Sequence, residues 1–193
     1  WTTFMTGMDP QHTGVFDWGR ITENYVRELI DSRSNPYPTF WEHLERFGKQ
    51  SLIYNIPITY PPRPLKDSNL IASFFTPSLD SQFTFPSELR EELLDEFPDF
   101  FIDIAPMKYT NRPPQDFFKR CQEMLKLRIK VFNYLMRTKS TDLSAVVFTA
   151  FDRLQHMYLN YLDKNHPQYK QPVKELEVEI SKTFKILDNF IGE

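Results

Sequence analysis

The sequence predicts an α/β protein that forms part of a doubly wound, mostly parallel sheet flanked by helices. Two observations favour this class. Short apolar runs typical of strands alternate with longer segments in which apolar residues recur at three- and four-residue steps, the period of a helix packed on one side. In addition, the helical pattern of Pro38–Phe47 is followed by Gly48 and the apolar run Ser51–Ile56, which is the helix–turn–strand order of one α/β unit.

The segments on either side of this unit differ in character. Residues 1–8 are predicted to be the end of a helix stopped by Gly7, and Tyr25–Ile30 a strand or a short helix. Residues 57–112 are rich in proline and are predicted to form an insertion or cap segment. The elements predicted within it are a strand at Leu70–Phe75, a helix at Ser87–Phe97 with Ser87 as its N-cap, and a second strand at Phe100–Ile104.

The second half of the chain contains the longest helical pattern, at Pro113–Lys139. It is followed by a strand that begins at Asp142 and leads through a β-prone apolar run, expected to be buried, to Asp152. A helix from Arg153 to about Leu162 is predicted next, and an amphipathic helix at Pro172–Ile191 closes the chain.

Composition limits the classes of function. The chain has 193 residues, 40% hydrophobic and 25% charged, with a net charge of −3 and a pI near 5.9. This balance gives no electrostatic reason to expect nucleic acid or a membrane surface as a partner, and no apolar run is long enough to span a bilayer. We therefore expect a cytoplasmic protein. Cys121 is the only cysteine and lies in the apolar stripe of the longest predicted helix, which indicates a buried structural thiol.

Asp152 and His156 are the strongest candidates for chemistry. If the strand gives way to a helix at Asp152, both side chains lie close together at the carboxyl end of a sheet strand, where open α/β folds bind ligands. A carboxylate and an imidazole suit zinc or manganese. Two ligands are too few for a catalytic site, and the other three histidines do not cluster in the sequence. Spacing alone also leaves open a helix-capping Asp152 and a surface His156.

A second candidate lies in the Pro-rich segment. Tyr60 and Arg63 stand among prolines and could form a loop that faces the substrate. The alternative is an extended loop that packs against the protein without a role in binding.

Four stretches of the chain resemble a known family. In their order along the chain they are residues 4–18 (FMTGMDPQHTGVFDW), 55–64 (NIPITYPPRP), 74–80 (FFTPSLD) and 148–167 (FTAFDRLQHMYLNYLDKNHP). They resemble the type I phosphodiesterase/nucleotide pyrophosphatase-like proteins of the alkaline phosphatase superfamily. The resemblance covers nearly the whole chain, and its most specific part is the segment around Asp152 and His156.

The resemblance implies a metal-dependent phosphoester hydrolase with two zinc or manganese ions and a small phosphoester substrate. If the family's metal ligands are carried over to the matching positions of this chain, Asp152 and His156 ligate one of the two metals. The nucleophile is expected upstream of Trp1 and a further Asp–His pair beyond Glu193. The family usually has histidine where Thr13 stands, whereas His12 lies one place early.

Residues 1–193 are accordingly expected to be a single incomplete alkaline-phosphatase-like domain, an internal segment that is inactive alone. Thr2 and Thr3 lie near a helix start but are poor substitutes for the missing nucleophile. Sheet edges left open by absent strands would favour a homo-oligomer. The alternative hypothesis is a non-catalytic binding or regulatory domain that keeps the fold.

Overall fold

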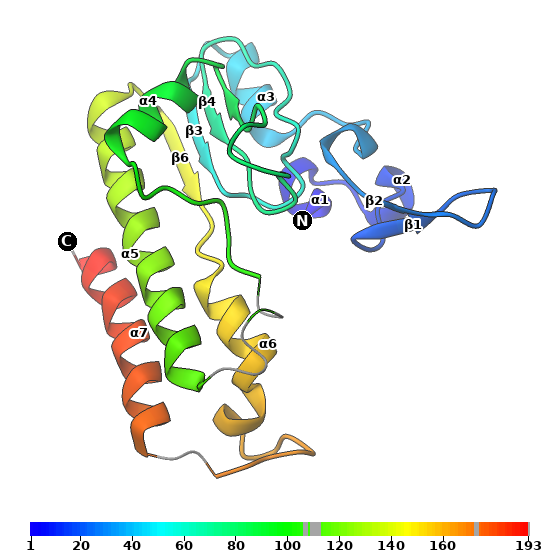
Figure 1. The fold of residues 1–193 in the computed structure, drawn as a ribbon. Helices are drawn as coiled ribbons and strands as arrows, with labels where there is room; N and C mark the ends of the chain where they lie inside the picture. Colours follow the sequence, from blue (N-terminus) through cyan, green and yellow to red (C-terminus); the bar gives the residue numbers. More distant parts are fainter. Residues whose placement is uncertain (106–107, 109–112, 172–173, 193) are drawn as a thin grey trace. The chain divides into compact units, whose positions relative to one another are not determined.

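The computed structural model describes residues 1–105, 108, 113–171 and 174–192. The chain forms two compact units (Figure 1). The first comprises Trp1–Ile102 and Phe132–Val147, and the second comprises Asp103–Val131 and Phe148–Glu193.

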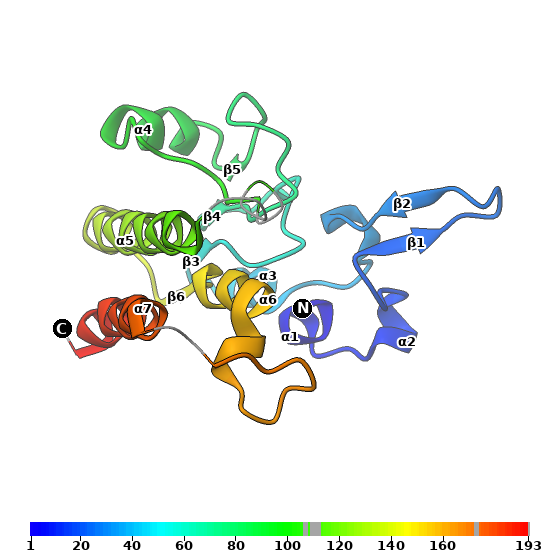
Figure 2. The same ribbon diagram turned by 60° about the horizontal axis from the view of Figure 1, so that its bottom comes forward.

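The first unit contains a four-stranded sheet among its described residues, in the order β5–β4–β3–β6. Strands β4 (Asn69–Ile71) and β6 (Leu143–Val146) each pair in parallel with the central β3 (Ser51–Tyr54), and β5 (Thr84–Phe85) pairs antiparallel with β4. Helices α3 (Phe40–Arg46) and α4 (Leu89–Glu96) flank this sheet on opposite sides (Figure 2). The predicted α/β class with a mostly parallel sheet is thereby confirmed.

The strands differ in burial according to their position in the sheet. All four residues of β3 are buried, as expected for a central strand covered on both faces. In β6, Leu143 is exposed and the next three residues are half-buried. The prediction of a buried strand before Asp152 is therefore wrong, because β6 occupies the edge of the described sheet.

Two of the predicted helix ends have clear local causes. Helix α1 (Thr2–Thr6) stops at Gly7, which adopts the left-handed conformation with φ 71°. Helix α3 starts at a capping box: Thr39 Oγ1 accepts from the Glu42 backbone N–H, and the Glu42 carboxylate accepts from the Thr39 N–H at 2.7 Å.

The predicted N-cap of α4 is wrong by one residue. Glu88 occupies that position, and its side chain makes no capping hydrogen bond. The Ser87 hydroxyl donates instead to the Glu88 carboxylate at 3.1 Å, so it is not directed at the helix.

Between α1 and α3 the chain forms the short helix α2 (Pro10–Thr13), an antiparallel hairpin and the 3₁₀ turn η1 (Ser32–Ser34). The hairpin strands are β1 (Gly19–Ile21) and β2 (Arg27–Leu29). The open choice at residues 25–30 is thus decided in favour of a strand, and β1 is an element that the sequence analysis missed.

The Pro-rich residues 57–112 contribute β4, β5 and α4 to the first unit. The strand predicted at Phe100–Ile104 is wrong. Phe100 is buried in a parallel stack on Phe83, with ring centroids 5.7 Å apart, without pairing to any strand. Residues 106–107 and 109–112 of this segment lie outside the described residues, and its status as an insertion stays a prediction.

The second unit is helical. It contains the first part of α5 (Pro114–Thr138) together with α6 (Ala150–Leu162) and α7 (Lys174–Gly192). Aromatic pairs join these helices: Phe118 of α5 packs on Tyr158 of α6, and Phe151 of α6 packs on Phe184 of α7. Phe148, which precedes α6, packs on Phe190 of α7. The three predicted helices are confirmed, although Pro172 and Val173 lie outside the described residues. Across the described ranges, no helix is both long enough and apolar enough to cross a bilayer.

Candidate functional site

Asp152 and His156 lie one turn apart near the start of α6. The helix begins at Ala150 with Thr149 at its N-cap, so Asp152 falls within the first turn and does not cap the helix. Asp152 Oδ1 is 3.4 Å from His156 Nε2, and the two side chains are 54% and 68% exposed. The structure therefore brings the predicted pair together on an accessible helix surface.

The strand-to-helix transition before this pair comes earlier than the sequence predicts. Strand β6 ends at Val146 and α6 begins at Ala150, although the β-prone run, in which Thr149 is polar, continues to Phe151. Phe148 and Phe151 pack against Phe190 and Phe184 of α7. The second half of the apolar run thus belongs to the helical core, which is why the strand does not reach Asp152.

A buried charge cluster lies beside the pair, and the sequence analysis missed it. The Asp103 carboxylate receives two hydrogen bonds from the Arg153 guanidinium, one from Nε at 3.2 Å and one from Nη2 at 3.1 Å. Arg128 Nη2 lies 3.9 Å from the same carboxylate. Asp103 and Arg128 are 8% and 2% exposed. Arg153 was a visible neighbour of Asp152 in the sequence, but nothing in the sequence indicated its partner 50 residues away.

Among the residues that the structure describes, no further metal ligands gather around Asp152 and His156. Within the described part of the chain, no group of three or more histidine, cysteine, aspartate or glutamate side chains could hold a metal. The other histidines lie on separate elements: His12 on α2, His43 on α3 and His166 after α6. The donor set is nevertheless suited to part of a zinc or manganese site, since it supplies one hard oxygen and one imidazole nitrogen.

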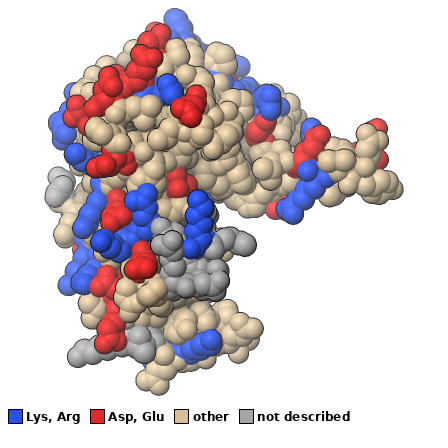
Figure 3. Space-filling model, viewed as in Figure 1, with Lys and Arg blue, Asp and Glu red and all other residues tan. Residues whose placement is uncertain are grey.

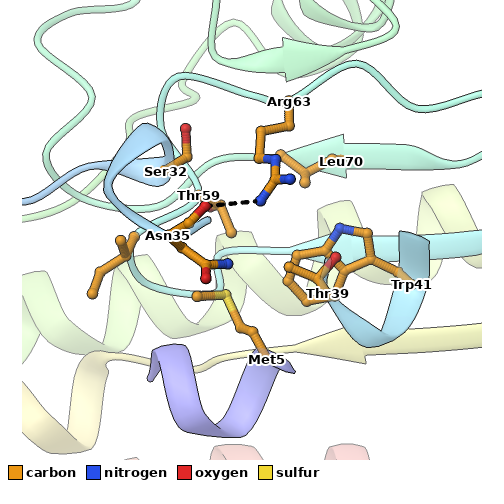
Figure 4. A pocket seen from close by; sticks show the side chains of 9 residues that line it. Met5, Ser32, Asn35, Thr39, Trp41, Thr59, Arg63 and Leu70 are labelled. Carbon is orange, nitrogen blue, oxygen red and sulfur yellow. Dashed lines mark hydrogen bonds between the residues drawn. The ribbon is translucent and has the colours of Figure 1, made fainter. Parts of the chain in front are cut away.

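Tyr60 and Arg63 lie in the first unit, in the loop after β3. Arg63 Nη1 donates to the carbonyl oxygen of Asn35 at 3.4 Å (Figure 4). The same atom donates to the carbonyl oxygen of Tyr37 at 3.1 Å, and Nη2 forms an ion pair with Glu42 at 3.2 Å. The Tyr60 carbonyl accepts from the Ser32 N–H at 2.9 Å. Both residues thus hold the neighbouring loop, and their role in substrate binding stays a prediction.

The cavity beside Arg63 is small. Its volume is about 10 Å³, room for about one water molecule. Buried side chains that include Met5, Thr39 and Trp41 line it (Figure 4). This cavity is too small to accommodate a phosphoester substrate.

Thr2 and Cys121, two further residues considered from the sequence, are both buried. Thr2 is 3% exposed in the five-residue helix α1, a position that hides its hydroxyl from solvent. Cys121 is fully buried in α5, and this burial, with a contribution from the nearby Asp103 charge, raises the pKa of its thiol to about 12. Such a thiol is a structural group and not a nucleophile at neutral pH.

The fold defines an α/β protein, and helix α6 presents a carboxylate and an imidazole side by side on its exposed surface. The chain belongs to the type I phosphodiesterase / nucleotide pyrophosphatase family, whose model matches residues 1–193. This family comprises hydrolases of the phosphodiesterase and pyrophosphatase type, which act on small phosphoesters. Searches of curated proteins and of solved structures found no match.

Proposed function

We propose that this chain belongs to a metal-dependent phosphodiesterase and supplies Asp152 and His156 to one of two divalent metal ions. The observation that carries the proposal is the 3.4 Å approach of two exposed donors on α6. Family membership over residues 1–193 supports the reaction class. Zinc and manganese are the proposed ions, because one carboxylate oxygen and one imidazole nitrogen suit both.

The two residues have different chemical roles in this proposal. Asp152 supplies negative charge, and its place in the first turn of α6 is favourable because the helix dipole is positive there. His156 supplies a neutral nitrogen donor. The spacing of four residues puts both donors on the same side of α6. A divalent ion bound at such a site polarises a phosphoryl oxygen and stabilises the charge that develops during phosphoester cleavage.

The domain and partner predictions belong to the same proposal. Residues 1–193 are proposed to form a single alkaline-phosphatase-like domain, with 57–112 as an insertion or cap segment. Homo-oligomer formation through the half-exposed edge strand β6 is also proposed. Light scattering on the purified chain tests this last point, and a monodisperse monomer across micromolar concentrations would contradict it.

The test of function uses the protein expressed from its complete reading frame. After removal of metal with a chelator, hydrolysis of bis(p-nitrophenyl) phosphate is measured on addition of Zn²⁺ or Mn²⁺. Asp152→Asn and His156→Ala are each expected to lower metal-restored kcat/KM by at least about 100-fold, the loss expected when transition-state charge stabilisation is removed.

A matched control uses another aspartate and histidine close to α6. Asp163 follows the end of this helix, and the His166 N–H donates to its carbonyl oxygen. Asp163→Asn and His166→Ala are expected to retain activity. If the wild-type protein gains no hydrolysis from either metal, the alternative of a non-catalytic binding or regulatory domain is favoured. If only the control variants lose activity, the assignment of Asp152 and His156 is wrong.

A further inference from the structure

Arg153 is held on one side by a buried carboxylate. Its Nε and Nη2 atoms donate to the two oxygens of Asp103 at 3.2 and 3.1 Å, the two-point geometry that arginine forms with carboxylates. Its side chain is 14% exposed and that of Asp103 is 8% exposed. Thr149 Oγ1 also approaches Asp103 Oδ2, at 3.4 Å. The guanidinium therefore has a fixed plane and direction.

The remaining arm of the same guanidinium reaches the proposed metal ligand. Arg153 Nη1 lies 3.3 Å from Asp152 Oδ2, while the other oxygen, Oδ1, lies 3.4 Å from His156 Nε2. One carboxylate oxygen is thus engaged by arginine, and the other is turned toward the imidazole. An exposed aspartate without such a neighbour would sample several rotamers.

We propose that Arg153, anchored by Asp103, is a positioning residue that holds the Asp152 carboxylate in the orientation needed to ligate metal together with His156. The inference rests on the proposed function, since it assigns Asp152 and His156 to a metal. Partners beyond the direct ligands orient ligands in protein metal sites generally, and their loss commonly lowers metal affinity 10- to 100-fold.

The positive charge of Arg153 explains why a positioning role beside a metal requires Asp103. A lone guanidinium beside a divalent cation would repel it. Here the Asp103 carboxylate lies 3.1 Å from Arg153 Nη2 and offsets the positive charge of the guanidinium. Arg153 can therefore orient Asp152 at a smaller electrostatic cost to metal binding.

Arginine and lysine are not equivalent at this position. Three separate guanidinium nitrogens make the contacts with Asp103 and Asp152. A lysine ammonium is a single point charge and cannot make this fork of contacts with both carboxylates. Arg153→Lys keeps the charge and is therefore the conservative variant, while Arg153→Met keeps only the apolar stem.

The experiment measures metal binding itself. In the protein expressed from its complete reading frame and stripped of metal, Zn²⁺ alone is titrated by calorimetry, and the visible absorption of bound Co²⁺ reports ligand geometry. Arg153→Met is expected to weaken Zn²⁺ binding at this site by about 10-fold or more and to change the Co²⁺ spectrum. Arg153→Lys is expected to fold like the wild type and still bind Zn²⁺ more weakly.

Two comparisons make the result specific. Lys139 forms a half-buried ion pair with Glu92 in the first unit, so Lys139→Met controls for the loss of an ion pair as such and is expected to keep wild-type affinity and spectrum. Asp152→Ala tests the ligand directly and is expected to abolish binding at this site.

The outcomes separate the inference from the function on which it rests. If Asp152→Ala abolishes binding but both Arg153 variants bind Zn²⁺ with wild-type affinity and an unchanged Co²⁺ spectrum, Arg153 has a purely structural role and the inference is overturned. If Asp152→Ala itself binds normally, the proposed metal site fails and the inference fails with it.

Discussion

The side-chain amide of Asn55 donates a hydrogen bond to the carbonyl oxygen of Val147 at 2.5 Å, joining the residues that follow β3 and β6. The Asn55 N–H also donates to the carbonyl oxygen of Ile71, the last residue of β4, at 2.9 Å. Asn55 is fully buried and has a φ of 62°. One residue in the left-handed conformation therefore links the carboxyl ends of three neighbouring strands.

This arrangement predicts an unusual order of stability at position 55. Asn55→Ala loses the side-chain hydrogen bond, about 1 kcal/mol, and places in the left-handed conformation a residue that tolerates it less well than asparagine does. Asn55→Gly loses the hydrogen bond but tolerates the positive φ. Denaturant unfolding is expected to give wild type above glycine above alanine, and an alanine variant more stable than the glycine variant would contradict this account.

Glu45 makes a second contact between distant segments. Its Oε1 accepts hydrogen bonds from the backbone N–H groups of Lys66, Asp67 and Ser68 at 2.9–3.1 Å. Glu45→Ala is expected to lower the free energy of unfolding by about 1.5–3 kcal/mol, because these hydrogen bonds go to a charged acceptor.

The two control variants distinguish hydrogen bonding from a general loss of charge. Glu45→Gln keeps one carbonyl acceptor and should lose less stability than Glu45→Ala in the same urea titration. Glu91→Ala removes an exposed carboxylate in the first turn of α4 and should change stability by less than about 0.5 kcal/mol. Equal losses at both positions would show that the backbone contacts of Glu45 are unimportant.

Arg63 allows its structural and substrate-binding roles to be separated. Because its donors engage two carbonyl oxygens and Glu42, Arg63→Ala is expected to lower the free energy of unfolding by about 1–3 kcal/mol. Thermal unfolding measures this loss, with Arg46→Ala on the exposed side of α3 as control. A raised KM with unchanged stability would instead support direct contact with substrate.

Cys121 gives a prediction about pH. Its thiol has a pKa of about 12 in the folded protein, raised mainly by burial, against about 8.5 for a free thiol. The folded state therefore retains a proton that the unfolded state releases in alkali. The stability contributed by this difference is complete below about pH 8.5 and is lost as the pH rises toward 12.

The measurement compares wild type with Cys121→Ala. The difference between their free energies of unfolding should be constant from pH 6 to 8 and should shrink between about pH 9 and 11. In the native wild type at pH 8, alkylation by iodoacetamide should be slow and limited by unfolding. Rapid labelling without denaturant would contradict the burial of this thiol.

The distribution of charged side chains on the surface agrees with the nearly balanced numbers of acidic and basic residues in the sequence. Basic and acidic side chains are interspersed on the face shown in Figure 3, as the small net charge of −3 leads one to expect. Formal charge could be counted from the sequence, but the pairing of buried and half-buried charges could not. Lys139 with Glu92 and Arg153 with Asp103 are each separated by about fifty residues.

The elements that depend on local pattern could be predicted from the order of the residues. Helices α3, α5 and α7 and strand β3 follow from apolar periodicity, caps and glycine stops, which act within a few residues. The proximity of Asp152 and His156 was equally predictable, because residues four apart on any helix are neighbours.

The features that depend on distant partners became visible only in the folded chain. The apolar run at Phe100–Ile104 could have been a strand, but Phe100 stacks on Phe83 instead. The run before Asp152 became a half-exposed edge strand followed by helix, because its phenylalanines pack on α7. Asp103 likewise became a candidate for a functional role only because the structure pairs it with Arg153. Burial and ion pairing depend on contacts between segments far apart in the sequence. The local pattern of residues therefore does not predict them.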